Sequence, residues 1–255
     1  MPTDKKTIKS YDAYALKWAE KMRNGGNTVH TYLEKPAMHK KLPPLKDKVV
    51  LCIGCGTGEE CAYLKSLGAK KVVGIDISKG LIDIAKKSYP HIEFHVMDME
   101  KLRFRPASFD FVYSSLTMHY VKDWTKTLSN VRAVLKPNKS FLFSTYHPIK
   151  SGTAIKRSKK KYSFLMGFEK NKSNQGKIFG DYFTTRKIND IWFDELRVAY
   201  YHRSFSAIMH DILKSRFIIS DIIEPQPIKS LAKKWPYFYR VRSKIPIFII
   251  FKLTK

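Results

Sequence analysis

Short apolar runs alternate with amphipathic segments through the middle of the chain. The apolar runs predict strands at 49–53, 71–77, 92–97, 109–114 and 141–145, and the segments between them predict helices at 60–67, 79–88 and 122–135. Strands and helices that alternate at this spacing are typical of a doubly wound, mostly parallel sheet. Right-handed crossovers would bring the carboxyl ends of these strands to one edge, where such sheets bind ligands.

The flanking regions follow other patterns. Residues 11–42 read as helical and end at Pro43-Pro44, because proline cannot continue a helix; one face carries Tyr11, Tyr14, Ala15, Trp18 and Met22. Residues 148–202 break the rhythm and predict a loop followed by a hairpin-like lid. A helix at 206–216 and strands at 217–224 and 245–253 close the chain. We therefore expect a single domain with a helical cap (1–44), a core (45–147), an insertion (148–202) and a C-terminal part (203–255).

Length and composition suit one α/β core with an elaboration. The chain has 255 residues, of which 44% are hydrophobic. The first six residues are polar, and the longest strongly apolar run, 245–251, is too short to span a bilayer. We therefore expect a cytoplasmic protein without membrane insertion.

The positive charge is large and uneven. The formal net charge is +26, and residues 151–255 hold 22 basic and 8 acidic side chains, which is +14 of that total. Two basic segments, 156–161 and 229–244, could attract nucleic acid. Lysines greatly outnumber arginines, however, whereas phosphate recognition favours the planar fork of arginine. A solvated basic surface is therefore favoured over a nucleic-acid partner.

The three cysteines lie close together, at Cys52, Cys55 and Cys61. Cys52 and Cys55 form a C-x-x-C pair, which in other proteins serves redox chemistry or half of a zinc site. No second pair exists to complete four ligands, and Cys52 falls inside a predicted buried strand. We therefore expect small core residues and no metal.

A glycine-rich turn follows the first strand of the core. Its glycines are Gly54, Gly56 and Gly58, and glycine allows bare backbone to approach a ligand closely. A dinucleotide fingerprint has the spacing G-x-G-x-x-G, but Glu59 occupies its third glycine position here. The turn therefore predicts a nucleotide-like ligand other than a dinucleotide.

Two further carboxylates follow predicted strands. Asp76 lies twenty-two positions after Gly54, where an acidic residue can accept hydrogen bonds from both ribose hydroxyls. The alternative is an aspartate that caps the next helix, although Ser78 could serve that purpose. After the third strand, Asp98 could accept from an adenine amino group while Met99 covers the ring. Together these positions predict an adenosyl ligand.

Two further segments follow the adenosyl-side carboxylates: Ser114-Ser115-Leu116-Thr117-Met118-His119-Tyr120 and Leu135-Lys136-Pro137-Asn138-Lys139-Ser140. Together with the glycine turn, Asp76 and Asp98, they resemble the motifs of class I S-adenosylmethionine-dependent methyltransferases over residues 45–147. Segments 34–38, 146–148, 201–203 and 223–227 resemble a bacterial-type subgroup that acts mostly on small molecules. The resemblance implies a Rossmann-like sheet of seven strands and S-adenosylmethionine as the cofactor. The cofactor-binding residues that it implies are Tyr11, Gly54, Cys55, Gly56, Gly58, Asp76, Ile77, Asp98, Met99, Ser114 and Leu116.

The sequence departs from this family at two places. The family usually has an acidic residue at the position of Cys52, which organises the turn near the methionine amino group of the cofactor. The turn before the fifth strand usually reads Pro-Gly-Gly, and here it reads Pro137-Asn138-Lys139. Asparagine tolerates a positive φ, so the second change is mild.

Histidines and aromatic residues are candidates for the acceptor side. His119 and His147 follow strands and could act as a general base, with His119 the leading candidate, and His202 precedes the late helix. A structural, hydrogen-bonding histidine is the alternative for each. Tyr146, Trp192 and Tyr201 could line an aromatic acceptor pocket, although a buried lid core would also explain them.

The predicted function is methyl transfer to an oxygen or nitrogen atom of a small-molecule acceptor. The alternatives are an RNA or protein methyltransferase that uses the basic segments, and a non-catalytic protein that binds S-adenosylmethionine. The chain lacks an Asn/Asp-Pro-Pro-aromatic clamp after the fourth strand and a Pro-Cys nucleophile. Both absences weigh against methylation of nucleic-acid bases.

Overall fold

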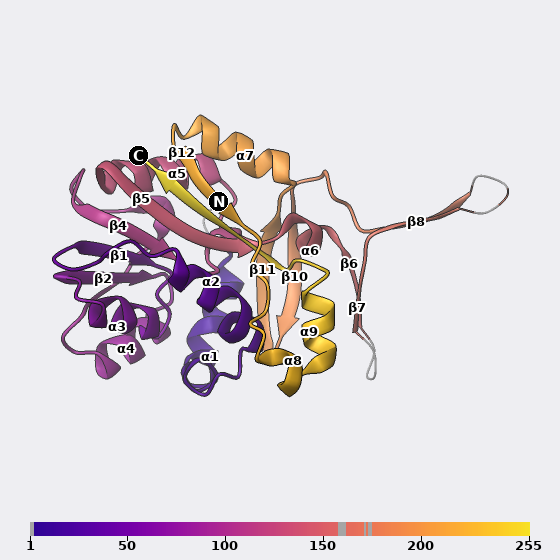
Figure 1. Ribbon diagram of the computed structural model, residues 1–255, viewed down its shortest axis with the longest axis horizontal. Coiled ribbons are helices and arrows are strands. Elements are labelled where there is room, and N and C mark those ends of the chain that lie inside the picture. The colour runs from indigo at the N-terminus through magenta and orange to yellow at the C-terminus, as the bar shows by residue number, and fades with distance from the viewer. Residues whose placement is uncertain (1–2, 158–161, 171, 173–174) are drawn as a thin grey trace.

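A twisted seven-stranded sheet forms the centre of the molecule in the computed structural model, which describes residues 3–157, 162–170, 172 and 175–255 (Figure 1). The strands are β1 (Val49–Ile53), β2 (Lys71–Asp76), β3 (Glu93–Val96), β4 (Phe109–Ser114), β5 (Leu135–Tyr146), β12 (Ile218–Ile223) and β13 (Phe248–Thr254). Their spatial order is β12–β13–β5–β4–β1–β2–β3. β13 runs antiparallel to both of its neighbours, β12 and β5, and the other neighbouring pairs of the sheet are parallel. The predicted doubly wound, mostly parallel sheet is therefore confirmed.

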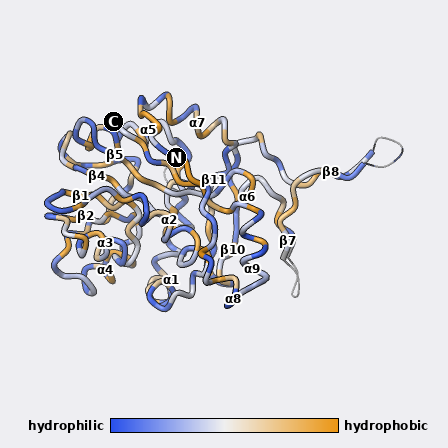
Figure 2. Tube along the Cα trace, viewed as in Figure 1, coloured by the Kyte–Doolittle hydropathy of each residue, from blue (hydrophilic) through white to orange (hydrophobic). Residues whose placement is uncertain are grey.

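Helices cover both faces of the sheet, so its central strands are apolar on both sides. The helices are α3 (Glu59–Ser66), α4 (Lys79–Ser88), α5 (Trp124–Val134) and α7 (Phe205–Lys214). In β1, Leu51 and Ile53 pack in the cluster that contains α5 and α7, whereas Val50 and Cys52 pack in the cluster that contains α3 and α4. Figure 2 shows the hydrophobic colour along these strands. Alternating side-chain direction along a strand produces the two clusters.

The predicted helical cap is present and consists of several helices. Its elements are α1 (Lys5–Arg23), a π-helical turn η1 (His30–Glu34) and α2 (Lys35–Lys40). Asp4 starts α1 earlier than expected, because its carboxylate accepts the N–H of Thr7. Gly25, with φ +67°, follows the end of α1.

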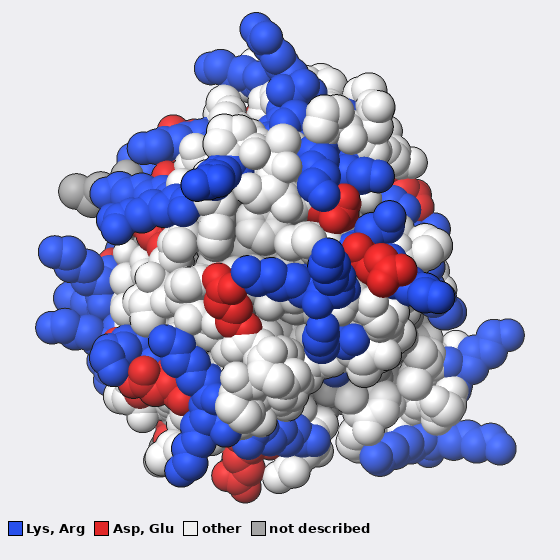
Figure 3. Space-filling model, turned by 90° about the vertical axis from the view of Figure 1, so that its left-hand side faces the viewer, with Lys and Arg blue, Asp and Glu red and all other residues white. Residues whose placement is uncertain are grey.

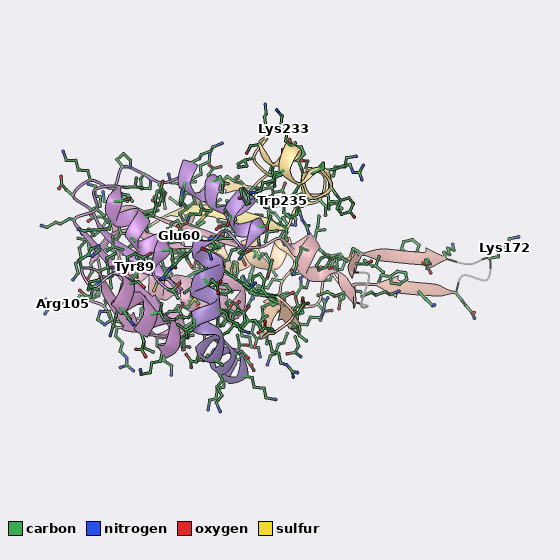
Figure 4. All side chains as sticks on the ribbon, turned by 90° about the horizontal axis from the view of Figure 1, so that it is seen from below. Glu60, Tyr89, Arg105, Lys172, Lys233 and Trp235 are labelled. Atoms are coloured by element: carbon green, nitrogen blue, oxygen red, sulfur yellow. The ribbon has the colours of Figure 1, made fainter. Side chains whose placement is uncertain are left out.

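The insertion after β5 is richer in structure than predicted. It contains α6 (Pro148–Gly152) and three antiparallel hairpins: β6 (Ala154–Arg157) with β7 (Tyr162–Leu165), β8 (Gly167–Lys170) with β9 (Gly176–Phe179), and β10 (Arg186–Trp192) with β11 (Leu196–His202). The prediction of a loop before the lid was therefore wrong. Residues 158–161 of the first basic segment lie outside the described residues. Figure 4 shows the β8–β9 hairpin extending from the body, with Lys172 at its tip.

The C-terminal part confirms the predicted pair of last strands, since β12 and β13 are antiparallel neighbours. The second basic segment forms α8 (Leu231–Lys234) and α9 (Pro236–Arg242) between them. In the part of the chain that the structure describes, no helix combines the length and the apolar character needed to cross a membrane.

Candidate active site

A cavity of about 630 Å³ lies along the edge where the parallel strands end. Residues from the ends of five strands line it: Gly54 after β1, Asp76 at the end of β2, Asp98 after β3, Ser115 after β4 and Tyr146 at the end of β5. The helix α1 and the β10–β11 hairpin contribute further walls, including Tyr11 and Trp192. The cavity thus occupies the ligand-binding edge expected for this sheet.

The glycine turn forms the floor of the cavity at two of its three glycines. Gly54 (φ +66°) lies so close to Thr117 that an added Cβ would be 2.1 Å from its Oγ1. Gly56 (φ +54°) is more open, because an added Cβ would meet only Trp18, with Nε1 3.4 Å away. A side chain at position 56 would therefore occupy cavity space, which is the property required for bare backbone to approach a ligand.

Gly58 differs from the other two, because it does not line the cavity. It precedes α3 with φ +93°, and an added Cβ would lie 2.9 Å from Phe94 Cζ and 2.9 Å from Tyr89 Cδ2. Gly58 was predicted to contact the cofactor, but the structure places it outside the cavity lining. Gly58 instead lets α3 begin close to β3 and α4.

We expect Gly58→Ala to destabilise the fold by roughly 2–4 kcal/mol, because a left-handed backbone and an overpacked core both oppose the new methyl group. Gly68 is a matched control: its φ is +89°, and the nearest atom to an added Cβ would be Lys46 Cα at 3.6 Å. Gly68→Ala should therefore cost only the conformational part, about 1–2 kcal/mol. Urea unfolding of both variants measures the difference, and equal losses would contradict the packing role of Gly58.

Asp76 combines burial with a fixed orientation. Its carboxylate accepts the N–H of Gly56 at 3.0 Å and the N–H of Ser78 at 2.9 Å, while the residue lines the cavity. Burial raises the pKa of this carboxyl above its usual value, although these backbone N–H groups oppose the shift. Ser78 itself caps α4 by accepting the N–H of Leu81. Ser78, and not Asp76, is therefore the N-cap residue of α4.

Asp98 and Met99 also line the cavity, beside Ile77. Asp98 precedes a short 3-10 helix, η2 (Met99–Lys101), and its Oδ1 accepts the N–H of Glu100 at 2.9 Å. Met99 is buried in the core that it shares with α5. A carboxylate and an apolar side chain thus lie together at the β3 end of the cavity.

The cysteines are buried thiols. Cys52 lies in β1, Cys55 lies in the glycine turn and lines the cavity, and Cys61 lies in α3; all three are free. Burial raises the pKa of Cys55 to about 11, so this thiol is neutral at physiological pH. Their packing against one another and against apolar neighbours agrees with small core residues.

His119 lies in an aromatic chamber at the β4–β5 end of the cavity. It belongs to a second 3-10 helix, η3 (Met118–Tyr120), and is 2% exposed. The surrounding rings are Tyr120, Tyr146, Tyr200 and Trp192, with centroids 4.4–6.3 Å from the imidazole. Neither ring nitrogen of His119 has a hydrogen-bond partner among the described residues. Burial, and then the charge of Lys150, lower its pKa to about 3, so the imidazole is neutral.

A buried lysine and a buried aspartate, neither of which the sequence predicted, also line this chamber. Lys150, 7% exposed, comes from α6; its Nζ lies 3.9 Å from the ring centroid of Tyr146 and donates to Tyr200 Oη at 3.0 Å. Asp190, 8% exposed, accepts from Trp192 Nε1 at 3.1 Å. No local pattern distinguishes them from surface charges, since lysine and aspartate are usually exposed.

Two of the predicted histidines lie outside the cavity lining and have partners. His147 caps α6: its Nδ1 accepts the N–H of Ile149, and its Nε2 lies 2.7 Å from Glu224 Oε1. His202 has Nδ1 2.8 Å from Ser151 Oγ and Nε2 2.8 Å from the Tyr182 carbonyl oxygen. The structure therefore assigns both to the structural alternative, because both ring nitrogens of each are occupied.

Tyr201 and Ser114 are also absent from the cavity lining. Successive side chains of a strand point to opposite faces, so Tyr200 faces the aromatic chamber while Tyr201 faces away, beneath the guanidinium of Arg203 at 5.8 Å. Ser114 is buried in β4, and its neighbours Ser115 and Leu116 line the cavity instead.

A charged cluster, which the sequence did not predict, lies beside the glycine turn. His30 Nδ1 lies 2.8 Å from Glu34 Oε2, and its Nε2 lies 3.8 Å from Glu60 Oε1. The carboxylate of Glu60 also lies 3.1 Å from Lys35 Nζ and 3.2 Å from His39 Nε2. Figure 4 shows Glu60 within the body of the molecule. Acidic residues are common in the first turn of any helix, so Glu60 carried no distinct signal in the sequence.

Comparisons with known proteins identify the class of proteins that share this arrangement. Residues 51–143 match a family described as a methyltransferase domain. An uncharacterized protein of Haemophilus influenzae is 31% identical over 216 residues, 81% of each chain. The crystal structure of an S-adenosylmethionine-dependent methyltransferase from Mesorhizobium loti superposes with a TM-score of 0.72 at 25% identity, covering 86% of this chain and 96% of that one.

Relatives named for an activity match over a shorter part. The malonyl-[acyl-carrier protein] O-methyltransferase of Halalkalibacterium halodurans is 34% identical over 110 residues. The demethylmenaquinone methyltransferase of Chlorobaculum parvum is 32% identical over 98 residues. This chain spans about two fifths of the length of each, 40% and 41%.

Proposed function

The chain belongs to the class I S-adenosylmethionine-dependent methyltransferases, and from this premise we propose that it transfers the methyl group to an oxygen or nitrogen atom of a small-molecule acceptor. The cofactor of this family, S-adenosylmethionine (SAM), supplies an electrophilic methyl group when bound. The observation that carries the proposal is one cavity that joins the glycine turn and Asp76 to the chamber around His119. Positioning an acceptor in line with that methyl group then provides much of the rate acceleration.

The residues at the β1–β3 end of the cavity fit an adenosyl group. Gly56 leaves space above the turn, Asp76 presents a buried carboxylate for ribose hydroxyls, and Asp98 with Met99 offers a carboxylate and an apolar surface for adenine. Tyr11, whose Oη lies 2.6 Å from Tyr120 Oη, lies where the two halves of the cavity meet. We assign these residues to cofactor binding on this basis.

The acceptor is assigned to the aromatic chamber. The two unpartnered nitrogens of His119 can accept a hydrogen bond from an acceptor hydroxyl or amine, or donate one, without breaking an existing bond. The neutral state of the imidazole leaves one nitrogen able to take a proton from the acceptor. Tyr146 and Trp192 provide flat apolar walls that favour a planar or apolar acceptor.

A small molecule is favoured over RNA or protein because the chamber is enclosed. His119 and Tyr200 are almost entirely buried. On the face seen in Figure 3, the basic side chains are spread among acidic ones and do not gather into one stripe. The demethylmenaquinone relative supports a small acceptor, although it matches mainly over the cofactor-binding half.

An acceptor screen that measures release of S-adenosylhomocysteine (SAH) tests the proposed function. Phenols, amines and carboxylic acids of low molecular weight form the first panel, and we expect turnover with at least one class. Turnover only with RNA or with a folded protein would overturn the small-molecule assignment. Wild-type protein that binds SAM but transfers no methyl group to any of these would favour the non-catalytic alternative.

Binding to RNA distinguishes the rival function independently of turnover. A protein that contacts several phosphates loses affinity steeply with salt, by about 0.7 log units per contact and log unit of salt for single strands. We expect weak RNA binding and no effect of RNA on SAM affinity, because the basic side chains act as solvated surface. Tight RNA binding with a steep slope, lost when lysines of 229–244 are replaced, would contradict this expectation.

A further inference from the structure

The charged cluster beside the glycine turn faces the cavity with both signs of charge. Three of its side chains, His30, Lys35 and Glu60, line the cavity. Glu34 is fully buried behind them; one carboxylate oxygen lies 2.8 Å from His30 Nδ1, and the other accepts from Ser115 Oγ at 2.9 Å. Cations and a carboxylate therefore lie within a few ångströms of one another on one wall.

The surroundings of Glu60 and of His30 favour the charged form of each side chain. Burial opposes the ionisation of Glu60, but the hydrogen bond from His39 and the charges of Lys35 and His30 outweigh it and lower its pKa to about 2. Burial likewise disfavours protonated His30, but the hydrogen bond and charge of Glu34 outweigh it and raise its pKa. An unpaired buried charge is costly, and on this wall each charged side chain lies beside one of opposite charge.

The order of the strands decides which end of the cofactor meets this wall. Asp98 and Asp76 lie at the ends of β3 and β2, so an adenosyl group held there extends its remaining part over β1 and β4. Glu60 is held near the end of β4, because the hydroxyl of Tyr113 in β4 donates a hydrogen bond to its Oε2 at 3.2 Å. The part of SAM beyond the sulfonium is an amino acid with one ammonium and one carboxylate group.

We propose that Glu60 binds the α-ammonium group of SAM and that His30 and Lys35 bind its α-carboxylate. This assignment rests on the placement of the adenosyl group in the proposed function. Opposite charges on the wall match opposite charges on the ligand, and charge-assisted hydrogen bonds are the stronger kind. The five-residue π-helix η1 (His30–Glu34) fits such a role, because π-helical turns are rare and occur frequently at functional sites.

The proposal also gives a role to the unusual thiol of β1. Cys52 is paired in register with Tyr113, the residue whose hydroxyl contacts Glu60. With cysteine at position 52, the end of β1 lacks the acidic side chain that the family usually has there. The carboxylate of Glu60, which comes from the helix after the turn, supplies a negative charge at that place.

Two adenosine ligands separate this role from a purely structural one. SAH carries the amino-acid end, whereas 5′-methylthioadenosine has the same adenosine and sulfur but lacks that end. Isothermal calorimetry with both ligands on wild type and on Glu60→Gln measures the contribution of the charged wall. We expect Glu60→Gln to weaken SAH about tenfold or more, as loss of a charge-assisted hydrogen bond implies, and to leave methylthioadenosine unchanged.

His39→Gln is the matched control, because His39 contacts the same carboxylate but does not line the cavity. It should change the affinity for either ligand by less than about twofold. Lys35→Gln provides a second variant at a half-exposed side chain, should Glu60→Gln not fold, and it should weaken SAH selectively. Thermal unfolding verifies that each variant is folded.

Equal weakening of both ligands by Glu60→Gln or Lys35→Gln, or unchanged SAH affinity, would overturn the proposal. A loss of SAH affinity in His39→Gln as large as in Glu60→Gln would also overturn it, since the cluster would then act through structure. These measurements involve no acceptor. Selective SAH recognition without any methyl transfer would therefore leave this assignment standing and remove the proposed function alone.

Discussion

Asp76→Asn is expected to weaken SAH binding at least about a hundredfold, because it removes the charge from two hydrogen bonds to the ribose hydroxyls. The carboxylate of Asp76 is oriented before the ligand arrives, since the N–H groups of Gly56 and Ser78 donate to it. An amide offers only one acceptor oxygen and would turn a donor toward one of these N–H groups. Isothermal calorimetry with SAH measures the loss.

Asp110→Asn is the matched control for this variant. Asp110 also accepts a backbone N–H, that of Val49 at 2.9 Å, and it pairs with Lys136 at 2.9 Å, but it does not line the cavity. Its replacement should lower the free energy of unfolding without changing SAH affinity. If Asp76→Asn binds SAH as tightly as wild type does, the ribose assignment is wrong.

His119→Ala should lower kcat by about a hundredfold or more while SAH affinity stays near that of wild type, which is the effect expected for loss of a group that takes a proton from the acceptor. His119 lies in the chamber around Tyr146 and Trp192, at the opposite end of the cavity from Asp98. Steady-state rates with an acceptor from the screen, together with calorimetry, separate the two effects. Equal losses of SAH affinity and rate would make His119 structural.

The pH dependence offers a second check on His119. Burial and the charge of Lys150 lower its pKa to about 3, so the free enzyme already holds the neutral imidazole at pH 5. Acidification from pH 7 to pH 5 should therefore cause no loss of kcat/KM through protonation of His119. An acidic limb near pH 6.5 that disappears in His119→Ala would show that the imidazole titrates normally.

His147→Gln controls for a histidine at the end of a strand that is not in the chamber. The substitution removes the contact between His147 and Glu224, and neither residue lines the cavity. We expect a modest loss of stability and unchanged kcat. A drop in kcat as large as that of His119→Ala would contradict the division of roles between the two histidines.

Most of the fold was predictable because its signals are local and repeated. The apolar runs at β1 and β4 matched the observed strands to the residue, and the strand pairing followed from their alternation with helices. The insertion was less predictable. Its hairpin β8–β9 is almost entirely exposed, and such strands lack the alternation of buried and exposed positions that marks a strand in a sequence.

Part of the candidate site was likewise predictable from the sequence, and part was not. Gly54, Asp76 and Asp98 follow buried parallel strands, whose carboxyl ends share one edge, so their order in the sequence already predicts that they meet. The histidines could not be sorted by position. His119, His147 and His202 all lie near strand ends, yet only His119 among these three lines the cavity, because the direction of each side chain depends on packing.

The sequence by itself determined the sheet, the glycine turn and the two carboxylates that we propose to bind the adenosyl group. Their spacing is set by chain geometry within one or two strand-helix units. Only the tertiary structure decided the composition of the aromatic chamber and of the charged wall. Lys150, Trp192 and Tyr200 reach His119 from the insertion, and His30 and Lys35 reach Glu60 from the cap. Contacts between such distant segments arise from packing, which no local pattern of residues encodes.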